Sequence, residues 1–103
     1  MARYALPLAG YGNASTWGYD PHQMTYFADL WRDSSDSFED PDFSIGWFTR
    51  SCEISGPQDL AEMIAARTRA TVPDVLRAMS AAETAPEAAI LAELAEVLAT
   101  PVL

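Results

Sequence analysis

Three short segments of the same form punctuate the second half of the chain, and they constrain its fold more than any other feature. They are Ser-Gly-Pro-Gln at 55–58, Thr-Val-Pro-Asp at 71–74 and Thr-Ala-Pro-Glu at 84–87. A hydroxyl side chain can accept a hydrogen bond from a free backbone N–H in the first turn of a helix. Proline fits among the first helical residues because their N–H groups have no helical partner. The three segments therefore predict three helix starts, each capped by its serine or threonine.

Apolar residues recur behind each predicted cap with the spacing of an amphipathic helix. We expect each of these stripes to face the core, and we expect Pro101 to mark the end of the third helix. In chain order the stripes are Leu60, Met63 and Ile64; Val72, Val75, Leu76 and Met79; and Ile90, Leu91, Leu94, Val97 and Leu98.

The first half of the chain has a different composition, because all the tryptophan, tyrosine and phenylalanine residues precede Glu53. Aromatic enrichment favours strands, and we expect strands at 4–8, 15–19, 24–32 and 43–50. Asp20-Pro-His-Gln between the second and third strands predicts a tight turn, since proline is favoured at the second turn position. Together the two halves predict the α+β class: an N-terminal antiparallel β-meander of three to four strands, followed by three capped α-helices packed on one face.

The chain is expected to form a single domain, because 103 residues leave room for one core. Residues 1–53 would be its β-meander half and residues 54–103 its helical half. We see no secretory signal and no apolar run of the length that crosses a bilayer, so we expect no membrane segment. The single cysteine excludes an intrachain disulfide and suits a cytoplasmic protein.

The predicted strand 24–32 carries large apolar side chains on both faces, so it is expected to be central, and its second face is a candidate contact for a partner chain. Aromatic residues at alternate strand positions commonly form cross-strand pairs in a core. In an acidic protein, an exposed group of them is instead a candidate protein interface, where tryptophan and tyrosine act as anchors. The candidate interface residues are Trp17, Tyr19, Tyr26, Phe27, Trp31 and Phe48.

The net charge of −9 argues against nucleic-acid binding, which requires a basic face to meet phosphates. All six basic residues are arginine, which together with the abundant alanine indicates a GC-rich bacterial genome. Five acids between the third and fourth predicted strands form a candidate acidic contact surface for a basic protein. A calcium loop starting at Asp40 is disfavoured, because Ser51 stands where the bidentate glutamate is needed. The five acids are Asp33, Asp36, Glu39, Asp40 and Asp42.

Residues that could carry catalysis are few. The only histidine, His22, lies in a predicted turn, and the only cysteine, Cys52, lies near a predicted strand end. No nucleotide-binding or nucleophile motif is present. Segment 60–79 has the outline of a helix-turn-helix, but its second helix offers only Arg77 to DNA bases. We therefore predict no catalytic, cofactor or metal site.

The sequence leads to three functional hypotheses. The first is a non-enzymatic interaction protein, self-associating as a homodimer through the second face of the sheet. The second is an acidic, DNA-mimicking or charge-based inhibitor of a basic protein, of the kind found in phages and plasmids. The third is a small enzyme that uses His22, Cys52 or a carboxylate pair.

Overall fold

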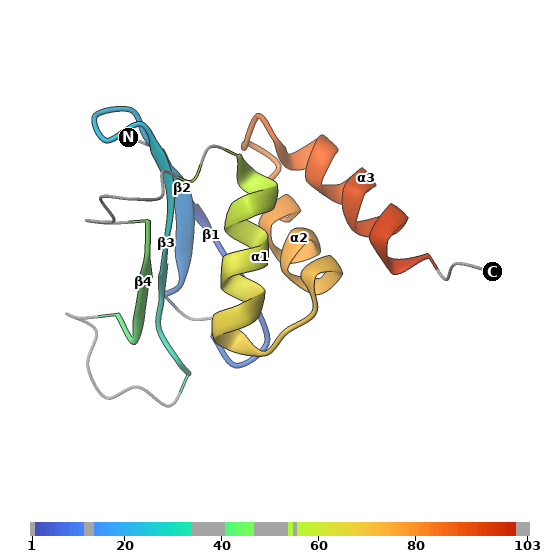
Figure 1. Cartoon of the computed structure of the whole chain (residues 1–103), viewed down its shortest axis with the longest axis horizontal. Coiled ribbons are helices and arrows are strands. Elements are labelled where there is room, and N and C mark those ends of the chain that lie inside the picture. The colour runs from blue at the N-terminus through green and yellow to red at the C-terminus, as the bar shows by residue number, and fades with distance from the viewer. Residues whose placement is uncertain (1, 12–13, 34–40, 47–53, 55, 101–103) are drawn as a thin grey trace.

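The computed structural model describes residues 2–11, 14–33, 41–46, 54 and 56–100. Four antiparallel strands come first and three helices follow, which confirms the predicted α+β class (Figure 1). The strands are β1 (Ala2–Ala5), β2 (Thr16–Asp20), β3 (Thr25–Leu30) and β4 (Phe43–Ile45); the helices are α1 (Pro57–Thr68), α2 (Val72–Ser80) and α3 (Ala88–Ala99).

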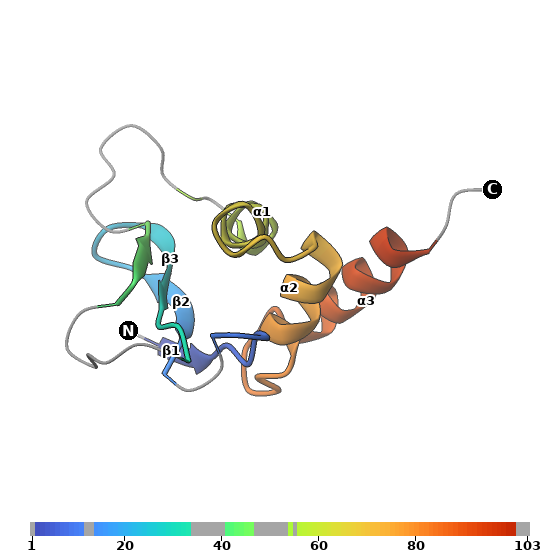
Figure 2. The same ribbon diagram turned by 90° about the horizontal axis from the view of Figure 1, so that it is seen from below.

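The strands follow one another across the sheet in the order β1-β2-β3-β4, as a meander requires. Trp17 of β2 lies opposite Tyr4 of β1 and Ala28 of β3, and Ala28 lies opposite Ile45 of β4. The three helices lie on one side of the sheet, with α3 farthest from it (Figures 1 and 2). The predicted turn at 20–23 is confirmed: the Asp20 carboxylate accepts hydrogen bonds from the backbone N–H groups of His22 and Gln23.

Three strands end earlier than predicted: β1, β4 and β3, which ends at Leu30 and not at Arg32. β1 stops at Ala5 because Pro7 has no N–H for the ladder, and Leu8 N instead donates to Leu6 O at 2.9 Å. β4 stops before Gly46, whose φ of 90° places it in the left-handed region. A Cβ atom at Gly46 would collide with the carbonyl oxygen of Tyr26, so only glycine fits there. The rest of the predicted strand 43–50 lies outside the described residues.

One hydrophobic core unites both halves of the chain, because side chains from the sheet and from all three helices belong to one cluster. Burial of this apolar surface is the main force that holds the helices against the sheet. The largest fully buried members are Leu6, Trp17, Leu30, Leu60, Ile64, Val75, Leu76, Met79 and Leu91.

The second face of β3, opposite to the helices, is also closed. The Phe27 ring is fully buried there, and the Arg3 guanidinium lies 5.1 Å from its centroid. Beside it, the buried Asp29 carboxylate accepts from Arg3 Nη1 at 3.2 Å and from Ser44 Oγ at 2.8 Å. The two-sided burial that the sequence predicts for this strand is therefore satisfied within the chain itself.

Of the three predicted caps, the structure bears out one. Thr71 caps α2, since its Oγ1 accepts from Asp74 N at 3.2 Å. α1 begins at Pro57, and its N-cap is Gly56 in place of the predicted Ser55, so the capping residue has no side chain to contribute. Ser55 lies outside the described residues.

The cap predicted at Thr84 is wrong. α3 begins at Ala88 and its N-cap is Glu87, with no side-chain cap hydrogen bond. The chain first makes successive turns, in which Ala85 N donates to Ala82 O at 2.8 Å and Ala88 N donates to Ala85 O at 3.0 Å. Ala85 is buried by these turns while Thr84 stays exposed. Burial of Ala85 thus outweighs the local preference for starting the helix at the threonine.

Candidate interaction surfaces

The outward side of α3 exposes several large apolar side chains, which corrects the prediction that its whole stripe faces the core. Leu91 is buried, but Ile90 is 66%, Val97 63% and Leu98 46% exposed. Leu94, between them on the helix surface, is half-buried. We refer to Ile90, Leu94, Val97 and Leu98 together as the α3 face.

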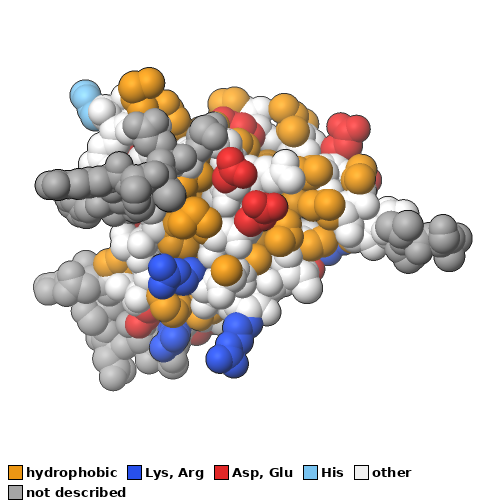
Figure 3. Space-filling model, in the orientation of Figure 1, with side chains coloured by type: hydrophobic (Ala, Val, Ile, Leu, Met, Phe, Trp, Pro, Cys, Tyr) orange, Lys and Arg blue, Asp and Glu red, His pale blue; other side chains and the backbone are white. Residues whose placement is uncertain are grey.

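A groove of about 360 Å³ runs beside the α3 face, between the start of α1 and α3. Hydrophobic side chains gather in this region of the surface, with acidic side chains beside them (Figure 3). The lining is mostly apolar and includes two carboxylates. Its main residues are Pro57, Asp59, Glu87, Ile90, Leu91 and Leu94.

A second, smaller pocket of about 240 Å³ lies where β1, β2 and β3 meet the turn before α3. Four aromatic rings form most of it. The ring centroids of Tyr4 and Trp17 are 5.1 Å apart, and those of Tyr19 and Tyr26 are 4.9 Å apart with the rings edge to face. Pro86 and Glu87 complete the lining, and we call this site the aromatic pocket.

A hydrogen bond ties the aromatic pocket to the beginning of α3. Tyr26 Oη donates to Glu87 Oε1 at 2.9 Å. Burial, together with this hydrogen bond to a carboxylate, raises the pKa of Tyr26 from 10.0 to about 12, so the phenol keeps its proton to a higher pH than an ordinary tyrosine. The pocket therefore presents one fixed carboxylate among aromatic rings.

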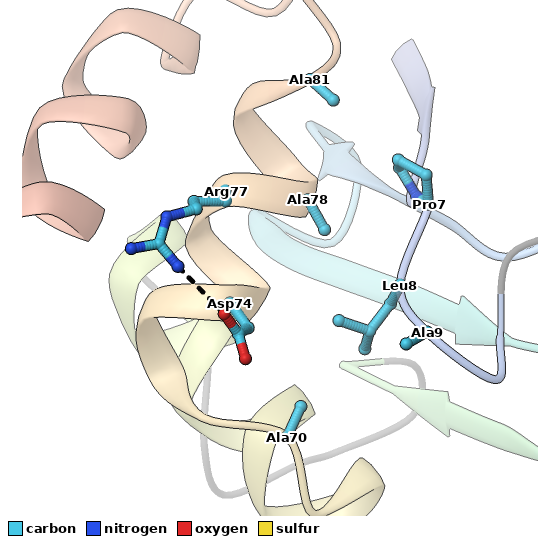
Figure 4. A pocket seen from close by; sticks show the side chains of 8 residues that line it. All are labelled: Pro7, Leu8, Ala9, Ala70, Asp74, Arg77, Ala78 and Ala81. Carbon is cyan, nitrogen blue, oxygen red and sulfur yellow. Dashed lines mark hydrogen bonds and ion pairs between the residues drawn. The ribbon is translucent and has the colours of Figure 1, made fainter. Parts of the chain in front are cut away.

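A third pocket, of about 390 Å³, lies between the segment after β1 and α2 (Figure 4). Pro7 and Leu8 face α2 across it. Asp74 Oδ1 and Arg77 Nη1 lie 3.0 Å apart on the helix side, so the two charges neutralise each other. With its charges paired and small side chains forming most of the remaining walls, this pocket offers little to recognise a ligand.

The structure divides the six residues of the predicted aromatic interface. Trp17 and Phe27 are fully buried inside the chain, so they present no surface to a partner. The prediction that these two residues belong to an interface is therefore wrong. Tyr19, 37% exposed, and the half-buried Tyr26 meet in the aromatic pocket. Trp31 is half-buried and lies outside the pocket lining. Phe48 lies outside the described residues.

Two of the five predicted acidic contact residues are described, and both are exposed. Asp42 Oδ2 accepts from Arg32 N at 2.7 Å, and Asp33 N donates to Gly10 O at 2.9 Å. These bonds hold the two ends of the 33–42 segment, while Asp36, Glu39 and Asp40 lie outside the described residues. The acidic surface therefore stays a prediction.

The other residues considered for chemistry are dispersed. His22 is exposed in the β2–β3 turn, and Cys52 lies outside the described residues. Within the described ranges, no three His, Cys, Asp or Glu side chains are grouped so that they could hold a metal ion. None of the helices in those ranges has the length and apolarity needed to cross a bilayer.

Comparison with known protein families, with curated proteins and with solved structures finds no match to this chain. The surfaces described above are therefore the features from which a function can be inferred.

Proposed function

We propose that this protein is a non-enzymatic interaction protein that associates with a second copy of itself through the α3 face. The observation that carries the proposal is the exposure of Ile90, Val97 and Leu98 on one helix. Contiguous exposed apolar side chains on a soluble protein commonly mark a protein-binding surface. The second face of the sheet, from which the sequence predicted self-association, is already closed by the chain itself.

The shape of the apolar stripe on α3 supports this proposal. An ordinary surface helix has an apolar stripe about 100° wide. On α3, the buried Leu91 and Ala95 adjoin the exposed α3 face, so apolar residues cover roughly half of the helix circumference at 3.6 residues per turn. The charged residues Glu93 and Glu96 lie on the remaining part. A helix apolar over this width is typical of one that is covered on two sides.

A second copy is a suitable occupant because a two-fold contact places the same apolar side chains against each other. Each copy carries a charge of −9, so the two copies also repel one another. Salt screens this repulsion and leaves apolar contacts intact. The affinity of the proposed dimer should therefore increase with salt concentration. This salt dependence distinguishes the dimer from a complex held together by opposite charges, which salt weakens.

The experiment is light scattering coupled to size-exclusion chromatography, over a range of protein and salt concentrations. The double variant Ile90→Glu/Val97→Glu should weaken the dimer about 100-fold or more, because each apolar side chain contributes roughly 1.5–3 kcal/mol on full burial. The matched control is Ala92→Glu/Ala99→Glu, which places two glutamates at the same spacing on exposed positions of the same helix. A chain that stays monomeric at all concentrations, or a dimer that both variants weaken equally, would refute the proposal.

A basic protein partner is the second candidate, and the groove beside α3 favours it. The Asp59 and Glu87 carboxylates lie in an otherwise apolar groove, which would suit a basic amphipathic helix. Fluorescence anisotropy with a labelled peptide of that type should show binding that weakens with salt and with Asp59→Asn. Asp74→Asn on the far side of α2 is the control. Binding that is insensitive to both salt and Asp59→Asn would exclude this candidate.

A further inference from the structure

The aromatic pocket has no part in the proposed self-association, and its construction points to a separate ligand. Tyr4 and Trp17 are register partners on β1 and β2, and Tyr19 and Tyr26 are register partners on β2 and β3. Trp17 and Tyr19 are two residues apart, so both point to the same face of the sheet. The four rings therefore form a block of two cross-strand pairs at one corner of the sheet. The helices leave this corner open, and Pro86 and Glu87 border it.

The chemistry of the lining selects for positive charge. Aromatic rings present a negative face, and a cation is attracted when it lies within about 6 Å of a ring centroid. The Glu87 carboxylate adds a full negative charge, which the Tyr26 hydroxyl holds in place. No basic residue is among the described side chains that line the pocket. Arg3 does not compete for it, because its guanidinium lies over Phe27 on the opposite face of the sheet.

The size of the pocket limits the ligand to a small group. Its volume of about 240 Å³ is below the roughly 300–1,000 Å³ of pockets that hold drug-sized ligands. Three partly exposed tyrosine rings and one carboxylate suit a compact, weakly hydrated cation better than a primary ammonium, whose N–H groups would need several acceptors.

We propose that the aromatic pocket binds an alkylated ammonium group, held against the rings of Tyr4, Tyr19 and Tyr26, with the buried Trp17 ring packed behind Tyr4, and paired with the Glu87 carboxylate. Such a group occurs in free quaternary ammonium compounds and in N-methylated lysine side chains of proteins. Both sources share the same binding chemistry, and the experiment below separates them.

The test is titration of the full chain with tetramethylammonium, with choline and with a short peptide containing trimethyllysine, followed by tryptophan and tyrosine fluorescence and by NMR. The neutral control is 3,3-dimethylbutanol, which has the shape of choline without its charge. We expect choline to bind about tenfold more tightly than this alcohol, the ratio that a desolvated cation–π contact provides. A peptide that binds more tightly than the free cations would identify a protein side chain as the source; free cations that bind equally well would identify a small molecule.

Variants assign the binding to the pocket. Tyr19→Leu removes a partly exposed ring and should weaken choline binding about tenfold, whereas Tyr19→Phe keeps the ring and should restore it. Glu87→Gln should weaken binding of the cations and leave the neutral alcohol unchanged. Thermal unfolding of each variant checks that the fold is intact. Equal binding of choline and the alcohol, or binding that Tyr19→Leu leaves unchanged in a folded protein, would overturn the proposal.

Discussion

The helices α1 and α3 each have twelve residues, but the fold uses them differently. α1 packs against β3, β4 and α2, and it buries Leu60 and Ile64 completely. α3 packs chiefly against α2 and buries one large side chain, Leu91, while Ile90 and Val97 remain exposed. The amount of apolar surface on a helix is therefore a poor guide to how much of it the helix buries in its own chain. The excess on α3 is what makes this helix, and not α1, the proposed interface.

The largest predicted effect is on stability, and it is the difference between truncating a buried side chain of α1 and truncating an exposed side chain of α3. Leu60→Ala in α1 should lower the free energy of unfolding by about 2–5 kcal/mol, because it removes a fully buried side chain. Ile90→Ala in α3 should change it by less than about 0.5 kcal/mol. Urea unfolding, at protein concentrations too low for association, measures both. Similar losses from the two variants would show that α3 is as integral to the monomer as α1.

A stability effect of intermediate size should distinguish the start of α2, which has a threonine cap, from the start of α3, which has none. Thr71→Ala removes the hydrogen bond from Asp74 N and should destabilise the protein by about 1 kcal/mol. Thr84→Ala lies in the same sequence pattern but caps no helix, so it should be close to neutral. Thermal unfolding of the two variants gives the difference directly. A loss at Thr84 comparable with that at Thr71 would mean that α3 begins earlier in solution.

The smallest effect concerns the attachment of α3 to the sheet through Tyr26 and Glu87. The folded pKa of Tyr26, about 12, is above its ordinary value of 10.0, so the folded state holds this proton more tightly than the unfolded state. The resulting stabilisation is complete below about pH 10 and is lost as the pH rises towards 12. Glu87→Gln should lower the Tyr26 pKa without restoring 10.0, since burial is the larger cause.

Phenolate absorbance, compared with that of Tyr26→Phe, follows this titration. A Tyr26 pKa that Glu87→Gln leaves unchanged would show that the hydrogen bond contributes nothing to this pKa.

The sequence was sufficient for the fold class, the order of the elements and the Thr71 cap, because each depends on periodicity or on local hydrogen bonds. It was insufficient at Thr84, where a similar local pattern is overruled by the burial of Ala85. The periodicity of apolar residues also predicted the apolar side of α3, but it did not predict how much of that side packs against α2. Such coverage depends on the packing of elements distant in sequence.

The sequence predicted an aromatic interface, and two of its partly exposed residues line the aromatic pocket. Tyr19 and Tyr26 were candidates, but Trp17, expected to be an exposed anchor, is a fully buried part of the wall. Tyr4 and Glu87 were missed. Tyr4 could have been found once the register of β1 and β2 was known, because it lies opposite Trp17. Glu87 had no signal in the sequence, since its place beside Tyr26 follows from the turns that precede α3.

The hydrogen bond between Tyr26 and Glu87 joins residues 61 positions apart, and this separation has a consequence for biosynthesis. During translation the three strands that carry the rings leave the ribosome long before the carboxylate does. The nascent sheet can pair its aromatic residues early, but the aromatic pocket stays unfinished until α3 docks. A ligand of the finished pocket would thus stabilise only chains in which α3 has folded onto the sheet.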